Sequence, residues 1–156
     1  MFMDISLNGS AMLSRTSEYA LRALICMARQ DAGRTVSCKR IAALTDIPPK
    51  YLSKVLGDLV RVGVLASSRG KSGGFRMARR PQETRLLEVL VPFEQFGRRC
   101  PFGQERCSDE DPCLAHDQWK RVLEAQHRFL SRTSVYDIAV KKRDRSRTNS
   151  GKRIRP

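Results

Sequence analysis

The sequence contains no apolar run that approaches the ~20 residues needed to span a membrane as a helix. The segment Met1–Ser10 has Asp4 but no basic stretch and no continuous apolar stretch, so we expect no secretory signal. Acidic residues are scarce, with 16 Asp and Glu against 30 Lys and Arg. These absences disfavour membrane and secreted proteins, and the net charge of +14 indicates a polyanionic partner.

The positive charge is concentrated at the two ends of the 156-residue chain. Residues 1–82 hold 14 Lys and Arg against 5 Asp and Glu, a net +9. Residues 83–140 hold 8 against 10, a net −2, and residues 141–156 hold 8 against 1, a net +7. This distribution is typical of a nucleic-acid binder whose middle part serves another purpose, although a solvated basic surface would give the same totals.

The first half predicts three helices. The first is capped by Ser14 or Thr16 and ends before Gly33. Ser37 is a suitable N-cap for the second, and Pro48-Pro49 can begin the third, which ends at Gly63. Apolar residues at helical spacing mark the buried sides of the first and third helices: Leu21, Leu24, Ile25, Ala28, Leu52, Val55, Leu56 and Leu59.

The second and third helices are joined by a brief turn, which is typical of a helix-turn-helix. The polar side of the third helix begins with Lys50, Tyr51, Ser53 and Lys54. A recognition helix meets bases and phosphates with its N-terminal residues, so these four side chains are predicted DNA contacts.

A strand, a glycine-rich loop and a second strand are predicted over residues 64–78. Arg69, Lys71 and Arg76 supply positive charge at the tip and flanks, as in a winged-helix hairpin that enters a minor groove. The loop lacks the full spacing of a nucleotide phosphate-binding loop, and no βαβ pattern surrounds it. We therefore predict a mainly α winged helix-turn-helix with three helices and a two-stranded wing.

Beyond the wing, the pattern predicts a short helix capped by Thr84 and stopped by Pro92. A longer helix begins near Leu114, and a last short helix begins at Thr133 or Ser134 and runs to Val140. The apolar face of the long helix exceeds what a small domain must bury, so we expect it to form a homodimer contact rather than core packing alone. That face carries Trp119, Val122, Leu123, Gln126, Phe129 and Leu130.

Three cysteines follow the short helix in a loop-like stretch, at Cys100, Cys107 and Cys113, and His116 comes three positions after the last. Five cysteines without a secretory signal suggest the reducing cytoplasm, where clustered thiols more often bind metal than form disulfides. Thiolates suit zinc or an iron–sulfur cluster. Structural zinc normally uses C-x2-4-C pairs, which are absent here, and this favours a cluster without excluding zinc.

The chain resembles the Rrf-two (BadM/Rrf-type) family of winged-helix transcriptional regulators, in its IscR/NsrR-like part. The resemblance covers Met12 to about Val140 and rests on LSRTSEYALRAL, IPPKYLSKVLGDLVRVGVLASSRGKSGGF and the cysteine triplet. It implies a homodimer that binds palindromic operators in double-stranded DNA, controlled by a 2Fe–2S or 4Fe–4S cluster on the three cysteines. The fourth ligand in the family is a histidine after the third cysteine or an acidic residue of the first helix. His116 and Glu18 match these positions, and we favour His116.

Two features depart from the IscR branch. The first cysteine gap has six residues where that branch usually has five. Ser53 stands where that branch has a glutamate in the recognition helix, so a cluster-dependent switch in DNA specificity that relies on this acid is not implied.

The sequence therefore predicts a cytoplasmic, non-enzymatic regulator with four parts. These are a disordered extension over 1–11, a DNA-binding domain over 12–82, a cysteine loop with dimerisation helices over 83–140, and a disordered basic tail over 141–156. The alternatives are a regulator with a zinc or thiol–disulfide switch, a cluster-free family member, an architectural DNA binder and a Cys/His enzyme.

Overall fold

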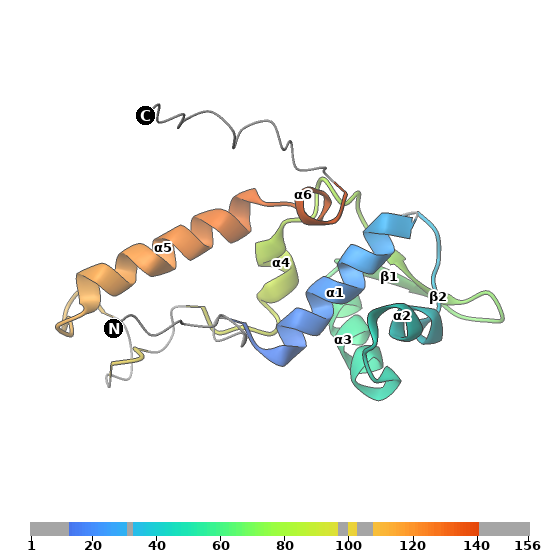
Figure 1. Cartoon of the computed structure of the whole chain (residues 1–156), viewed down its shortest axis with the longest axis horizontal. Coiled ribbons are helices and arrows are strands. Elements are labelled where there is room, and N and C mark those ends of the chain that lie inside the picture. The colour runs from blue at the N-terminus through green and yellow to red at the C-terminus, as the bar shows by residue number, and fades with distance from the viewer. Residues whose placement is uncertain (1–12, 31–32, 97–99, 103–107, 141–156) are drawn as a thin grey trace, which may run out of the picture.

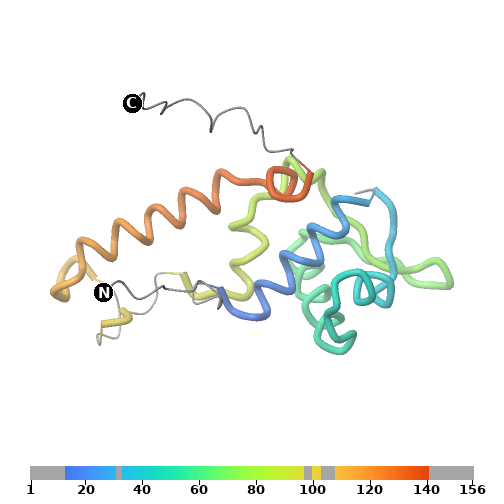
Figure 2. The backbone as a smooth tube through the Cα atoms, in the orientation of Figure 1, coloured from blue at the N-terminus to red at the C-terminus, as the bar shows by residue number. Residues whose placement is uncertain are grey.

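The computed structural model of the protein describes residues 13–30, 33–96, 100–102 and 108–140. The two terminal segments predicted to be disordered, and Cys107, lie outside the described residues. The chain is mostly helical, with one antiparallel hairpin (Figures 1 and 2). Its elements are α1 (Arg15–Gln30), α2 (Cys38–Thr45), α3 (Pro49–Arg61), β1 (Leu65–Ser68), β2 (Gly74–Met77), α4 (Leu86–Leu90), α5 (His116–Arg132) and α6 (Val135–Ala139).

The helix-turn-helix consists of α2 and α3, as the sequence predicts. The Ser37 side chain caps α2 by accepting a hydrogen bond from the Arg40 backbone N–H at 3.2 Å. Asp46 ends α2 in the left-handed region, with φ 52°, which a short polar side chain tolerates. Pro49 then begins α3, at the position where a missing N–H leaves no helical bond unmade.

The apolar stripe of α3 is buried as predicted. Each of its four residues is at most 3% exposed, and burying side chains of this size stabilises the fold by roughly 1.5–3 kcal/mol apiece. The stripe packs on α1, whose Ala20, Ala23 and Leu24 are fully buried. The polar side of α3 is thereby turned toward solvent.

The hairpin is the predicted wing, with Leu65 opposite Met77 and Ser68 opposite Gly74. The structure adds a partner that the sequence did not reveal, because Val36 exchanges two backbone hydrogen bonds with Phe75, at 2.8 and 2.9 Å. Gly74, at φ +156°, lies so close to this bridge that a Cβ would come within 2.4 Å of the Val36 carbonyl oxygen. The wing is thus fixed to the segment that leads into α2.

The segments around α4 and α6 form a second set of contacts. The Leu86 N–H donates to the Thr133 carbonyl oxygen and the Val135 N–H to that of Thr84, at 3.0 and 2.9 Å. Thr84 is fully buried, and Arg85 occupies the N-cap of α4, so the predicted Thr84 cap is wrong. The Thr84 hydroxyl cannot cap the helix because it donates its hydrogen bond to the Arg80 carbonyl oxygen instead, at 3.2 Å.

A capping box begins α6. The Ser134 side chain accepts from the Asp137 N–H, and the Asp137 carboxylate accepts from the Ser134 N–H at 2.9 Å. The helix packs on α1, where the Arg29 guanidinium donates to the Ala139 carbonyl oxygen at 2.9 Å. The end of the described chain is thereby held against the first helix.

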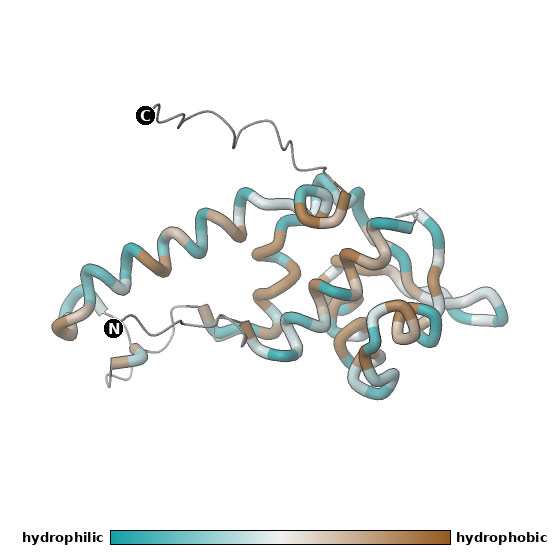
Figure 3. Tube along the Cα trace, viewed as in Figure 1, coloured by the Kyte–Doolittle hydropathy of each residue, from teal (hydrophilic) through white to brown (hydrophobic). Residues whose placement is uncertain are grey.

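The long helix α5 extends away from the rest of the fold and contacts α4 (Figure 1). Among its residues only His116 and Leu130 are buried in the single chain. Figure 3 shows hydrophobic positions recurring along this extended helix. In the described part of the chain, no helix has the length and apolar character to cross a membrane.

We predict that Gly74→Ala destabilises the fold by about 1–3 kcal/mol, because the new methyl group meets the Val36 backbone and cannot move away from it. Chemical denaturation followed by circular dichroism measures this loss. Gly57→Ala is the matched control, since a Cβ there meets nothing within 4 Å and the site is inside α3. It should stabilise the protein by roughly 0.5–1 kcal/mol. Equal unfolding free energies for the two variants would contradict the prediction.

Candidate nucleic-acid interface and metal centre

The four predicted contacts of the recognition helix lie at the N-terminal end of α3. Lys50, Tyr51, Ser53 and Lys54 are all exposed, and Tyr51 exposes 62% of its surface. They lie on the side of α3 opposite the buried stripe. Because that stripe faces the core, the four side chains face solvent together. Exposed cations beside an aromatic ring and a hydroxyl suit contacts to phosphates and base edges.

The predicted wing contacts are also exposed. Arg69 and Lys71 lie in the turn between β1 and β2, and Arg76 lies on β2 opposite Ala66. Gly70 adopts φ +102° in this turn, a conformation that side chains rarely allow. The turn therefore carries two cations on a tight backbone.

The structure adds cations that the sequence reasoning did not select. Lys39 and Arg40 lie exposed in the first turn of α2. Arg34 is exposed two residues before Val36, which pairs with the wing. The N-cap at Ser37 could have pointed to the first two, whereas Arg34 depends on a pairing between residues 36 and 75 that has no local signal.

The cysteine loop brings two distant thiols together. The Sγ atoms of Cys100 and Cys113 lie 3.7 Å apart, although the residues are 13 positions apart in sequence. This distance exceeds the ~2.05 Å of a disulfide bond, so the two sulfurs are in contact without being joined. Cys100 is buried, at 8% exposure. Two neighbouring thiols, one from each side of the loop, can supply two of the ligands of a thiolate metal site.

His116 begins α5 at the edge of this loop. It is 7% exposed, and its Nε2 lies 2.8 Å from the Asp109 Oδ1. The Lys120 ammonium donates to both oxygens of the same carboxylate, at 2.7 and 3.0 Å. Hydrogen bonds from Lys120 and His116 lower the pKa of Asp109, and its carboxylate in turn raises the pKa of Lys120. The carboxylate therefore links two side chains of one helix face.

A buried donor lies beside the same loop. The Trp119 ring meets Phe102 edge-on, with centroids 5.7 Å apart. The Trp119 Nε1–H is buried and has no hydrogen-bond partner within the described parts of the chain. An unmade buried hydrogen bond costs about 1–3 kcal/mol, so this site favours an added acceptor. Thiolate or sulfide sulfur is such an acceptor, and on this chemistry the loop fits a sulfur-ligated metal group.

The described residues alone do not complete a metal site. No three His, Cys, Asp or Glu side chains among them gather closely enough to hold an ion. The third predicted cysteine ligand, Cys107, is not among these residues. Glu18, the alternative fourth ligand, lies in the first turn of α1 and is partly exposed.

Glu94 ties the segment before the cysteine loop to the start of α1. Its carboxylate accepts from the Ser14 backbone N–H at 2.5 Å. Partial burial raises the pKa of Glu94, but hydrogen bonds from Ser17 and Ser14 outweigh this, and its pKa is lowered overall. A carboxylate at the positive end of a helix is also favoured by the helix dipole. Glu94 thus connects the loop to the helix that supports α3.

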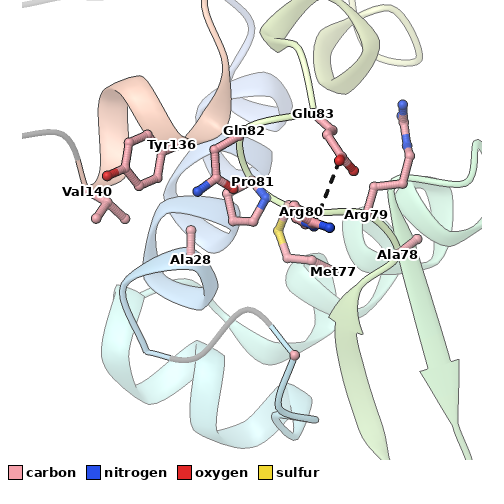
Figure 4. A pocket seen from close by; sticks show the side chains of 11 residues that line it. Ala28, Met77, Ala78, Arg79, Arg80, Pro81, Gln82, Glu83, Tyr136 and Val140 are labelled. Carbon is pink, nitrogen blue, oxygen red and sulfur yellow. Dashed lines mark ion pairs between the residues drawn. The ribbon is translucent and has the colours of Figure 1, made fainter.

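A cleft of about 620 Å³ lies between the end of α1, the segment after β2, and α6 (Figure 4). Its wall includes Met77, Pro81 and Tyr136, together with the Arg80–Glu83 ion pair. The described residues that line it include no cysteine or histidine. The cleft is therefore distinct from the site of Cys100, Cys113 and His116.

The winged helix with an exposed basic recognition face defines the protein as a winged-helix DNA-binding transcriptional regulator. The sequence profile of the Rrf2 family, described as "Iron-dependent Transcriptional regulator", matches residues 13–141. The chain belongs to the Rrf2 family. This confirms the resemblance given by the sequence motifs and the winged-helix fold class.

Individual relatives agree with this assignment. The HTH-type transcriptional regulator NsrR of Shouchella clausii is 32% identical over 136 residues, covering 85% of this chain and 91% of that protein. CymR, the global cysteine regulator of B. subtilis, has a similar structure, with a TM-score of 0.69 at 22% identity over 81% of this chain and 95% of that chain. T. potens IscR gives a TM-score of 0.67 at 22% identity over 83% of this chain and 86% of that chain. The two structural likenesses concern the fold.

Proposed function

We propose that this regulator is a homodimer that binds palindromic operator DNA and that an iron–sulfur cluster on Cys100, Cys107 and Cys113 controls its affinity. The observation that carries the proposal is the 3.7 Å contact between the Cys100 and Cys113 sulfurs in a chain with a DNA-binding fold. The match to a family described as iron-dependent supports iron as the metal. Acting on DNA, the protein would work in the cytoplasm.

The DNA contacts follow from the exposed surface of the winged helix. Lys50, Tyr51, Ser53 and Lys54 enter the major groove, and the wing residues Arg69, Lys71 and Arg76 reach the minor groove or the backbone. Lys39 and Arg40 add phosphate contacts at the first turn of α2. Two such modules related by two-fold symmetry require half-sites about one helical turn apart, roughly 34–36 Å.

The dimer contact is proposed on the outer face of α5. Val122, Ala125 and Phe129 are exposed and follow one another at i, i+3 and i+7, which aligns them in one row. Phe129 exposes 57% and Val122 43% of their surfaces. A second copy of the same helix, packed about a two-fold axis, would remove this apolar row from water.

The three cysteines and His116 would hold the cluster, which when bound supplies a centre sensitive to iron supply and oxidation. Glu18 remains the alternative fourth ligand. The protein's own contacts offer a route from the loop to DNA. Glu94 precedes the loop and bonds to Ser14 at the start of α1, and α1 packs directly on α3. A displaced loop can therefore shift the helix that supports the recognition face.

Zinc or a thiol–disulfide switch is the second candidate. It is favoured by the same sulfur contact, because two thiols 3.7 Å apart need little movement to join. A Cys/His enzyme is less favoured. Asp109 engages His116 at 2.8 Å, as a residue that orients a catalytic histidine would, but neither residue lines the cleft around Tyr136 or the cavity around Phe96 and Leu123.

We predict that Lys54→Ala and Lys71→Ala weaken operator binding and each reduce the salt slope of log K by about 1, because each removes one phosphate contact. Fluorescence anisotropy with labelled duplex across a salt series measures the slope. Arg121→Ala, an exposed cation on α5, is the matched control. An unchanged slope for both wing and recognition-helix variants would count against the assigned interface.

We predict that Phe129→Glu converts the dimer to a monomer, since it replaces the largest apolar side chain of the α5 row with a charged one. Analytical ultracentrifugation at micromolar concentration reports the mass. Glu124→Gln alters one charge on the same helix away from that row and should leave the dimer intact. If Phe129→Glu stays dimeric, the dimer contact lies elsewhere.

We predict that anaerobically purified protein contains iron and sulfide and absorbs visible light. Replacing Cys100, Cys107 and Cys113 with serine should abolish the bound iron, the sulfide and the absorption. Operator affinity should then change by roughly 5- to 150-fold, the usual range for coupled sites. Cys26→Ser is the control, because Cys26 lies on α1 outside the loop. Colourless protein with stoichiometric zinc would favour the second candidate, and equal affinities would refute regulation through the loop.

A further inference from the structure

The start of α5 presents three side chains on one face to the cysteine loop. His116, Trp119 and Lys120 are spaced i, i+3 and i+4, which aligns them on a helix. His116 and Lys120 both contact Asp109, and Trp119 contacts Phe102. The contacts lie on both sides of the middle of the loop, so the loop is held against α5 at two points.

Asp109 determines which nitrogen of the His116 ring carries a proton. An ionised carboxylate only accepts hydrogen bonds, so the 2.8 Å contact requires a proton on Nε2. In a neutral imidazole with a proton on Nε2, the nitrogen that can bind a metal is Nδ1. Two further donor contacts from Lys120 orient the same carboxylate.

We infer that Asp109 is a positioning residue for His116, holding its Nε2–H tautomer so that the imidazole binds iron through Nδ1, with Lys120 anchoring Asp109. This inference rests on the proposed function for its iron. With iron bound, the three groups would form a carboxylate–histidine–metal triad, in which the carboxylate orients the ring.

The exposure of the three side chains determines how strongly Asp109 should affect folding and iron affinity. The His116 side chain is 8% exposed, whereas those of Asp109 and Lys120 are 73% and 47% exposed. Exposed ion pairs contribute little to stability, so Asp109 should matter little for folding. Outer-shell partners of metal-binding histidines change metal affinity by 10- to 100-fold, and with Asp109 so exposed we expect about tenfold.

The first measurement uses the metal-free protein. The chain has two histidines, so ¹⁵N spectra of the imidazole rings of His127→Gln report His116 alone. We expect the Nε2–H tautomer. Asp109→Ala should give a mixture of tautomers, and Asp109→Asn should retain Nε2–H because its amide oxygen still accepts the bond. A dominant Nδ1–H tautomer in the otherwise unchanged protein would overturn the inference whether or not iron binds.

The second measurement uses the iron-loaded protein. Asp109→Ala should release iron to a chelator about tenfold faster, whereas Asp111→Ala, an exposed acid of the same loop, should not change the rate. In His116→Ala the Asp109 substitution should have no further effect. Pulsed electron paramagnetic resonance of the reduced, ¹⁵N-histidine-labelled protein should show one strongly coupled nitrogen that His116→Ala removes.

The outcomes separate this inference from the proposed function. If the tautomer is Nε2–H but anaerobic protein takes up no iron, the proposed cluster and the ligand role of Nδ1 both fail. If iron binds but no histidine nitrogen is coupled, the cluster stands and the positioning role is refuted. In that case Asp109→Ala, Asp109→Asn and Glu18→Gln, compared for iron release, identify whether an acid supplies the fourth ligand.

Discussion

Close packing of α1 is the constraint on which the rest of the structure depends. This helix contacts α2, α3, α4, α6 and β2. Ala20 and Ala23 are fully buried, and their small side chains allow neighbouring helices to approach closely. Because one helix supports both the recognition face and the segments around the cysteine loop, these two parts of the protein share a common core element.

Under the proposed function, this arrangement is the physical link between the cysteine loop and the recognition helix. The loop is held to α5 through Asp109 and Phe102, while the segment before it is held to α1 through Glu94. Few of these contacts are deeply buried, which suits an element that changes its position. The recognition helix, in contrast, is held in the core by four buried apolar residues.

Local signals predicted most of the helices and the wing. Ser37, Pro49 and Ser134 begin their helices as expected because caps and a first-turn proline act within a few residues. Thr84 failed as a cap because its hydroxyl bonds to the Arg80 carbonyl oxygen, while its own carbonyl oxygen accepts from Val135, a distant partner that no local pattern reports. The Val36–Phe75 bridge was missed for the same reason, since it joins residues far apart in sequence.

The sequence by itself determined the winged-helix class, the polar face of α3, the cations of the hairpin and the residue types of the cysteine loop. These follow from periodicity, turn chemistry and cysteine spacing, which are local properties of the chain. Only the tertiary structure decided that the Cys100 and Cys113 sulfurs lie 3.7 Å apart and that the Asp109 carboxylate forms a hydrogen bond with the Nε2 of His116. It also decided that α5 leaves its outer apolar row uncovered. Such contacts depend on how elements far apart in sequence pack together, and local patterns do not encode that packing.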